Sequence, residues 1–210
     1  MMNFRRLLPI ALLSLLFICG CGKKEDSKSS DNKVIENKLV INDYKTKSGK
    51  GFQVISRKLN ESLTDILVVG IGFENSRDTV KFMESEPFNT AFLADLNSDG
   101  FEELYIITKS SGSGSYLNLH GVASNKDKSY SNIAIQTISE KDLNEGKDFF
   151  GYMGHDKITA EKDALVREFP VYKQGDTNDK PTGGNKKVFY KLIAGESSYQ
   201  LKVVPKEISK

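Results

Sequence analysis

Residues 65–73 read Asp-Ile-Leu-Val-Val-Gly-Ile-Gly-Phe, and this stretch carries the strongest information about the fold. As a strand it would present apolar side chains on both faces, which is typical of a strand that lies inside a sheet. Gly70 and Gly72 would allow a bend or a close approach of another part of the chain. We therefore expect a central strand here.

Short runs of β-branched and aromatic residues continue on both sides of this stretch, separated by Gly, Asn, Asp and Ser. This pattern predicts strands joined by turns. The expected strands are 38–41, 52–57, 65–73, 79–83, 90–95, 103–108, 116–124, 130–138, 157–161, 164–172, 187–194 and 199–204. Their spacing favours an all-β sandwich or barrel over an α/β fold. No segment is repeated, which argues against a solenoid or a propeller.

One segment departs from the strand pattern. Residues 139–146 place Ser139 three residues before Asp142 and end at Gly146. A capping serine followed by an acid and a terminal glycine predicts a short helix, which we expect to connect two strands.

The N-terminus has the layout of a secretory signal, with Arg5 and Arg6 before an apolar stretch that ends in small residues. Ile18 and Gly20 before Cys21 resemble the bacterial lipobox, in which the cysteine is acylated and becomes the new N-terminus. An ordinary signal cut nearby, which would leave Cys21 free, is the alternative. We expect a signal peptide over 1–20 and lipidation at Cys21.

The composition separates a tether from a globular domain. Residues 22–33 contain no apolar side chain and cannot repay the entropy of ordering, so a flexible tether is predicted over 21–37 and the folded domain over 38–206. Without residues 1–20 the acidic and basic residues balance, which argues against a nucleic-acid partner. Cys21 would then be the only cysteine, so neither a Cys/His zinc site nor cysteine-nucleophile chemistry is expected.

An acidic loop follows the expected strand 90–95. Residues 95–103 read Asp-Leu-Asn-Ser-Asp-Gly-Phe-Glu-Glu, which places oxygen ligands on Asp95, Asn97, Asp99 and Glu103 around a turn glycine. Ca²⁺ takes six to eight oxygen ligands, and this spacing can bring four side chains to one point. The segment is not an EF-hand, because Ile106 stands where a bidentate Glu is required. A hairpin turn rich in Asp and Asn, without metal, is the alternative.

A second loop consists of small residues. Residues 110–116 read Ser-Ser-Gly-Ser-Gly-Ser-Tyr between two expected strands. Such a backbone can enter a narrow cleft, where it offers hydroxyls and amides as donors. A flexible hairpin end is the alternative interpretation.

A third stretch contains the pair His155-Asp156 and a long connection over 173–185. A hydrolase triad is not supported, because there is no Gly-x-Ser-x-Gly elbow and adjacent side chains on a strand point apart. Loops of the length of 173–185 are commonly functional or mobile.

Taken together, these segments resemble the periplasmic inhibitors of invertebrate-type lysozymes. The resemblance covers residues 64–204 and rests on the order of five motifs. In order along the chain they are Asp-x-Asn-x-Asp-Gly-x-x-Glu-Leu-Tyr, Ser-Gly-Ser-Gly-Ser-Tyr, Gly-Tyr-x-Gly-His-Asp, Arg-x-Phe-Pro-x-Tyr and Pro-Thr-Gly-Gly.

The resemblance implies an antiparallel β-sandwich of two sheets that has no catalytic activity, requires no cofactor and self-associates as a homodimer. The partner would be a lysozyme of a host or an invertebrate, with the invertebrate (I) type favoured. The binding loop comprises Ser111, Gly112, Ser113, Gly114, Ser115 and Tyr116. The family pattern Ser-Gly-x-Tyr falls on residues 113–116, but a second Ser-Gly step at 111–112 leaves two registers for the inserted serine.

Two functions therefore remain open. The first is a lysozyme inhibitor, held in the bacterial cell envelope by its lipid anchor and facing the periplasm or the surface, which protects peptidoglycan. The second is a structural or adhesive surface lipoprotein that binds calcium at residues 95–103, with a passive Ser-Gly loop. An exported hydrolase is a distant third.

Overall fold

The computed structural model describes residues 38–75 and 78–205. They belong to one compact unit. The predicted signal peptide, the tether with Cys21 and residue 206 lie outside the described residues. Within the described ranges, no helix has the length and apolar character needed to cross a membrane.

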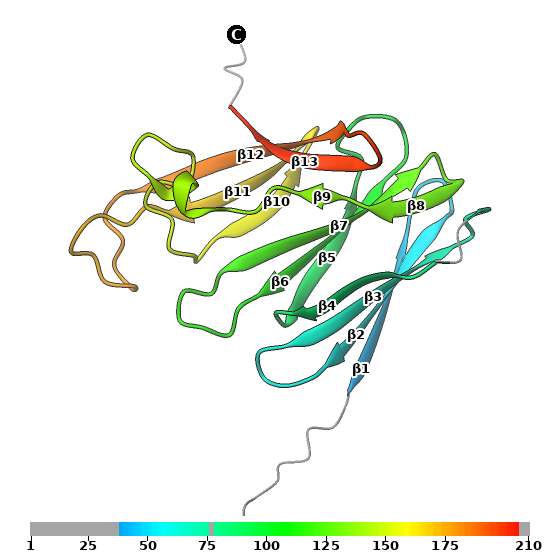
Figure 1. The fold of residues 1–210 in the computed structure, drawn as a ribbon, viewed down its shortest axis with the longest axis horizontal. Helices are drawn as coiled ribbons and strands as arrows, with labels where there is room; N and C mark the ends of the chain where they lie inside the picture. The colour runs from blue at the N-terminus through cyan, green and yellow to red at the C-terminus, as the bar shows by residue number, and fades with distance from the viewer. Residues whose placement is uncertain (1–37, 76–77, 206–210) are drawn as a thin grey trace, which may run out of the picture. The chain divides into compact units, whose positions relative to one another are not determined.

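The described chain forms three sheets, which are coloured in chain order in Figure 1. The N-terminal sheet has the order β1 (Leu39–Lys45), β2 (Gly51–Lys58), β3 (Thr64–Ile71) and β4 (Val80–Ser85). The middle sheet has the order β5 (Phe88–Ala94), β6 (Glu103–Lys109), β7 (Leu117–Asn125) and β8 (Ser129–Asn132). The C-terminal sheet has the order β10 (Lys157–Glu161), β11 (Ala164–Pro170), β12 (Asn185–Ala194), β13 (Tyr199–Val204) and β9 (Ala134–Ile135).

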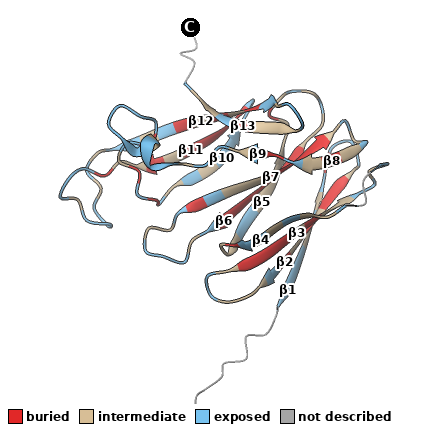
Figure 2. Ribbon diagram, in the orientation of Figure 1, coloured by how far each residue is buried: buried red, intermediate tan, exposed pale blue. Residues whose placement is uncertain are grey.

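Strand β6 lies between two hydrophobic cores. Leu104 and Ile106 pack with residues of β2 and β3, whereas Tyr105 packs with residues of the C-terminal sheet. Successive residues of a strand point to opposite faces, yet all three side chains are fully buried. The middle sheet is therefore covered on both faces, and buried residues gather on its strands and on the facing strands in Figure 2.

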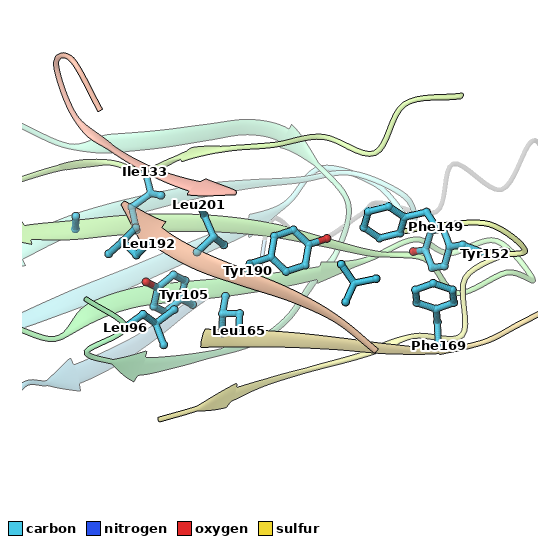
Figure 3. Packing of buried hydrophobic residues seen from close by; sticks show 12 residues of the cluster. Leu96, Tyr105, Ile133, Phe149, Tyr152, Leu165, Phe169, Tyr190, Leu192 and Leu201 are labelled. Atoms are coloured by element: carbon cyan, nitrogen blue, oxygen red, sulfur yellow. The ribbon is translucent and has the colours of Figure 1, made fainter. Parts of the chain in front are cut away.

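Among fully buried residues, the core between the middle and C-terminal sheets has more aromatic side chains than the other core. It contains Leu96, Tyr105, Ala123, Ile133, Phe149, Tyr152, Leu165, Phe169, Val188, Tyr190, Leu192 and Leu201. Figure 3 shows Phe149, Tyr152 and Phe169 grouped at one end of this core, with the leucines at the other end. The rings of Tyr152 and Phe169 are 4.9 Å apart, in an edge-to-face arrangement.

The predicted all-β fold of packed antiparallel sheets is confirmed, with three sheets where two were expected. The single parallel pair joins β13 to β9. It arises because the predicted strand 130–138 is divided: β8 pairs with β7, and the chain then passes through the buried Ile133 to β9 in the other sheet. The Ile133 N–H donates to the Gly121 carbonyl, 2.9 Å away, at this crossing.

The opening stretch 65–73 forms most of β3, which lies between β2 and β4 as predicted. Only one of its faces is fully covered: Ile66 and Val68 are buried, whereas Leu67 and Val69 are half-buried. Strand β6, in contrast, is buried on both faces over its first six residues. Gly70 does permit a close approach, since a Cβ there would lie 2.1 Å from the ring of Tyr130.

The predicted connecting helix is a single 3-10 turn over Glu140–Leu143. The Ser139 N–H donates to the Asp142 carboxylate at 2.8 Å, and the Asp142 N–H donates to the Ser139 carbonyl at 2.9 Å. The capping signal therefore locates the start of the turn, but the helix ends before Gly146.

Candidate binding loop and acidic cluster

Residues 110–116 connect β6 to β7 and form a closed hairpin end. The Ser110 N–H donates to the Tyr116 carbonyl at 2.9 Å, and the Tyr116 N–H donates to the Ser110 hydroxyl at 3.0 Å. A further bond of 3.0 Å joins the Ser115 N–H to the Gly112 carbonyl. Ser115 has a positive φ of 47°, which this tight turn requires. The loop therefore has a defined backbone.

The side chains of this loop differ in what they contact. The Ser111 hydroxyl donates to the Glu61 carbonyl at 2.8 Å, so it is engaged within the protein. Within residues 38–75 and 78–205, the hydroxyls of Ser113 and Ser115 have no hydrogen-bond partner. Tyr116 is 40% exposed, with one side of its ring against Tyr152 at a centroid distance of 5.6 Å. Of the two registers for an inserted serine, the one at Ser113 thus presents the free hydroxyl.

The segment 151–156 supports the loop from one side. The His155 N–H donates to the Gly114 carbonyl at 2.8 Å. Gly154, at φ +88°, lies so close that a Cβ there would be 2.0 Å from the same carbonyl oxygen. This explains why the Gly-Tyr-x-Gly-His-Asp motif carries a glycine at position 154.

The connection 173–184 supports the loop from another side through Asn178. Its side-chain amide donates to the Ser113 carbonyl at 3.0 Å, and its Oδ1 lies 3.2 Å from His155 Nε2. The Asn178 carbonyl accepts a 2.9 Å bond from the Tyr172 hydroxyl. Sequence reasoning did not include Asn178 in the site, since nothing in the local pattern shows that this distant loop reaches residue 113.

Asp176 organises the connection that carries Asn178. Its carboxylate accepts from the N–H groups of Lys173 at 2.7 Å and Thr182 at 2.8 Å, and from the Thr182 hydroxyl at 2.9 Å. The backbone donors of Lys173 and Thr182 hold the pKa of Asp176 below its usual value. An ionised Asp176 thus stabilises the turn that brings Asn178 to the binding loop.

Beneath the loop, Asp156 and Arg167 hold Leu117, the first residue of β7. The Leu117 N–H donates to Asp156 Oδ1 at 3.1 Å, and Arg167 Nη2 donates to the Leu117 carbonyl at 3.3 Å. The guanidinium of Arg167 also lies 5.8 Å from the Tyr152 ring and 5.9 Å from the Tyr190 ring. Asp156 is thus committed to Leu117 and Arg167, whereas His155 faces Asn178, so the two side chains diverge.

The predicted calcium ligands are brought together in the loop between β5 and β6. One carboxylate oxygen from each of Asp95, Asp99 and Glu103 lies within 4.8 Å of the other two. Asn97 Nδ2 donates to Asp99 at 3.0 Å, and Asn97 Oδ1 accepts from the Asp99 N–H at 3.1 Å. Burial, together with the nearby Asp99 and Asp95 carboxylates, raises the pKa of Glu103 to about 8.

A groove of about 830 Å³ lies beside the binding loop. The edge of β7 over 117–120 and the segment 133–138 form its walls, and Tyr152, Arg167 and Tyr190 contribute to its lining. The sequence did not predict this groove, because its walls come from segments that are far apart in the chain.

Comparison of the chain with models of protein families, with curated proteins and with solved structures gives no match.

Proposed function

We propose that this protein is a non-enzymatic lysozyme inhibitor, directed at invertebrate-type lysozymes, that inserts the loop 111–116 into the active-site cleft. One observation carries the proposal: the loop presents the hydroxyls of Ser113 and Ser115, which have no hydrogen-bond partner among the described residues, beside an exposed Tyr116, while neighbouring segments hold its backbone. The motif resemblance described above points to the same loop.

The donors of the loop match the chemistry of the expected target. Glycoside hydrolases act with two carboxyl groups set about 5–9.5 Å apart. Hydroxyl groups can donate to such carboxylates, and hydrogen bonds to charged groups are worth about 1.5–3 kcal/mol each. Ser113 and Tyr116 are the two side chains that we assign to these bonds. The inserted backbone would also block the entry of the sugar chain.

The contacts at the base of the loop lower the cost of binding. Loops that must become ordered on association lose affinity, and a loop already held in its bound conformation avoids that loss. Asn178 and the His155 backbone hold the carbonyls of Ser113 and Gly114. The free hydroxyls are thereby presented on a fixed backbone.

Apolar side chains near the loop would complete the contact. Tyr116, Phe150 and Met153 are exposed, although they are large and hydrophobic. Phe150 and Met153 flank the buried Tyr152, whose ring contacts Tyr116. Aromatic residues and methionine are enriched in protein interfaces, where aromatic anchors supply much of the binding energy.

We also propose that the protein is located in the cell envelope. Acylation of Cys21 would hold the inhibitor on a membrane, where it meets lysozyme that reaches the peptidoglycan. Self-association as a homodimer also belongs to this proposal.

A turbidity assay tests the loop mechanism. Purified protein should suppress the lysis of a bacterial cell suspension by an invertebrate-type lysozyme, and Ser113→Ala combined with Tyr116→Ala should restore lysis. We expect the Kd to rise by at least about 100-fold, the product of a lost charge-assisted bond and a lost aromatic anchor.

The matched control is Ser197→Ala with Ile193→Ala, which removes one hydroxyl and one exposed apolar side chain from β12 and the turn after it. This variant should inhibit like the parent protein. Full inhibition by the loop variant would refute the loop mechanism, and no inhibition by the parent protein would refute the function.

A further inference from the structure

The acidic cluster of Asp95, Asp99 and Glu103 brings three carboxyl groups together without a basic partner among the described residues. No salt bridge joins any of the three to a Lys or Arg of residues 38–75 and 78–205. Three carboxylates within 4.8 Å repel one another when ionised, and the repulsion is larger where water is excluded. A cation at this position would remove the repulsion.

Glu103 supplies an independent observation. Its side chain is fully buried, and its Oε1 is a buried atom without a hydrogen-bond partner among the described residues. The other oxygen, Oε2, accepts from the Leu96 N–H at 3.2 Å and from the Tyr105 hydroxyl at 3.4 Å. A buried carboxylate oxygen with no donor costs free energy unless a ligand satisfies it. Oε1 is therefore available to a metal ion.

The loop itself is already shaped for a ligand of this kind. Asp95 accepts from the N–H groups of Asp99 at 3.1 Å and Gly100 at 2.9 Å, which fixes its carboxylate. Gly100 has a φ of +89°, which lets the chain turn sharply between Asp99 and Glu103. Backbone donors thus hold the Asp95 carboxylate in place, and Glu103 is buried.

We propose that Asp95, Asn97, Asp99 and Glu103 bind one Ca²⁺ ion. Calcium takes six to eight oxygen ligands in adaptable geometry, and water or backbone carbonyls would supply those that the four side chains do not. Mg²⁺ suits the site less well, because it demands strict octahedral geometry and is usually held by one or two carboxylates. The bound ion would replace the missing donor at Glu103.

The loop that carries the site is hydrogen-bonded to the other two sheets. The Lys47 N–H of the β1–β2 turn donates to Glu102 at 2.8 Å, and the Tyr199 hydroxyl of β13 donates to Asp99 at 3.3 Å. The calcium loop is thus linked to both the N-terminal and the C-terminal sheet. An ion here would stabilise the junction of all three sheets.

The calcium site is independent of the proposed inhibitory loop. Glu103 begins β6 and Lys109 ends it, so the two loops lie at opposite ends of this strand, roughly 20 Å apart at about 3.3 Å per residue. A failure of calcium binding would leave lysozyme inhibition untouched, and the reverse also holds.

Thermal unfolding of the full chain, first treated with chelator and then titrated with CaCl₂ or MgCl₂, tests the proposal. Calcium at about 100 times its Kd should raise Tm by about 5–10 °C, and magnesium should raise it much less. Terbium, which replaces calcium, should give tyrosine-sensitised luminescence that calcium removes, because Tyr105 and Tyr199 lie beside the site.

Two variants identify the ligands. Glu103→Gln keeps the shape of the side chain, so it should fold with at least the Tm of the chelated parent protein and lose the calcium-dependent rise. Asp99→Asn should lose the rise as well. The control Asp127→Asn removes an acid that hydrogen-bonds Ser124 in the β7–β8 turn, and it should keep the full rise.

Two results would overturn the proposed site, and a third would overturn the choice of metal. One is a Tm of the parent protein that calcium does not change, together with the absence of terbium luminescence. The other is a calcium-dependent rise that persists in Glu103→Gln and Asp99→Asn, which would place the ion elsewhere. An equal response to magnesium would overturn the assignment to calcium.

Discussion

Arg167 and Asp156 form a buried ion pair beneath the binding loop, with 3.4 Å between Arg167 Nε and Asp156 Oδ2. Their side chains are 6% and 0% exposed. The same two residues hold the N–H and the carbonyl of Leu117, where β7 begins. The pair thereby links the folding of the C-terminal sheet to the position of the loop.

Arg167→Met should reduce the free energy of unfolding by about 3–5 kcal/mol, because it leaves Asp156 as a buried charge without its partner. Urea unfolding measures the change. Lys187→Met is the control, since Lys187 pairs with Glu168 at 3.7 Å on the surface and such pairs contribute about 0–1 kcal/mol. Equal losses in the two variants would contradict a special role for the buried pair.

Gly154→Ala should weaken lysozyme inhibition and reduce stability. Its Cβ would meet the Gly114 carbonyl oxygen at 2.0 Å, so the loop must move. The control is Gly49→Ala, at φ +88° in the β1–β2 turn, where a Cβ would meet nothing within 4 Å. This variant carries only the backbone strain, about 1 kcal/mol or somewhat more. Turbidity assays and urea unfolding of both variants separate displacement of the loop from backbone strain. If the two variants lose inhibition and stability equally, the contact between Gly154 and the Gly114 carbonyl does not position the loop.

Asn178→Ala should affect binding more than folding. Its side chain is exposed, so we expect a stability change within about 1 kcal/mol, but the Ser113 carbonyl would lose its donor. Less ordered loops bind less tightly, and we expect the Kd for lysozyme to rise by about 3- to 10-fold. Isothermal titration calorimetry gives the value. Asn185→Ala, which removes an exposed side-chain bond to Glu168, should leave the Kd unchanged.

Stability should depend on the protonation of His120. Burial lowers the pKa of His120 below its ordinary value, against the opposing effect of the Glu86 carboxylate. The unfolded chain therefore takes up this proton first as pH falls, so the contribution of His120 to the free energy of unfolding should decrease from pH 6.5 down towards the lowered pKa.

The comparison of the parent protein with His120→Gln isolates this effect by urea unfolding at neutral and mildly acidic pH. The contribution of Glu103, whose raised pKa changes stability in the opposite direction, is present in both proteins and cancels when their free energies of unfolding are subtracted. On acidification, the free energy of unfolding of the parent protein should fall relative to that of His120→Gln. Parallel pH profiles for the two proteins would show that His120 is not responsible.

The strands could be predicted because their signal is local. Alternating or continuous apolar runs and the turn residues between them are visible in the sequence, and β3 and β10 begin within one residue of their expected positions. The division of 130–138 between two sheets was not visible, because Ile133 continues the same apolar pattern on both sides of the crossing.

For the candidate sites, too, the sequence predicts continuous segments but not contacts between distant residues. The loop 111–116 and the acidic residues 95–103 are continuous segments, so their composition identified them. The partnership of Arg167 with Asp156 and the reach of Asn178 to Ser113 join positions far apart in the chain. Spacing cannot reveal such pairs; only the folded arrangement of the strands does.

The burial of β6 on both faces affects how the chain must be produced. The N-terminal sheet is complete by Ser85, yet its inner face, with Phe52 and Ile66, is covered only when Leu104 and Ile106 arrive. During synthesis, an apolar surface is therefore uncovered while the next residues emerge. Nascent chains with such surfaces aggregate unless a chaperone shields them. A holdase that binds the first half of this chain should raise its yield.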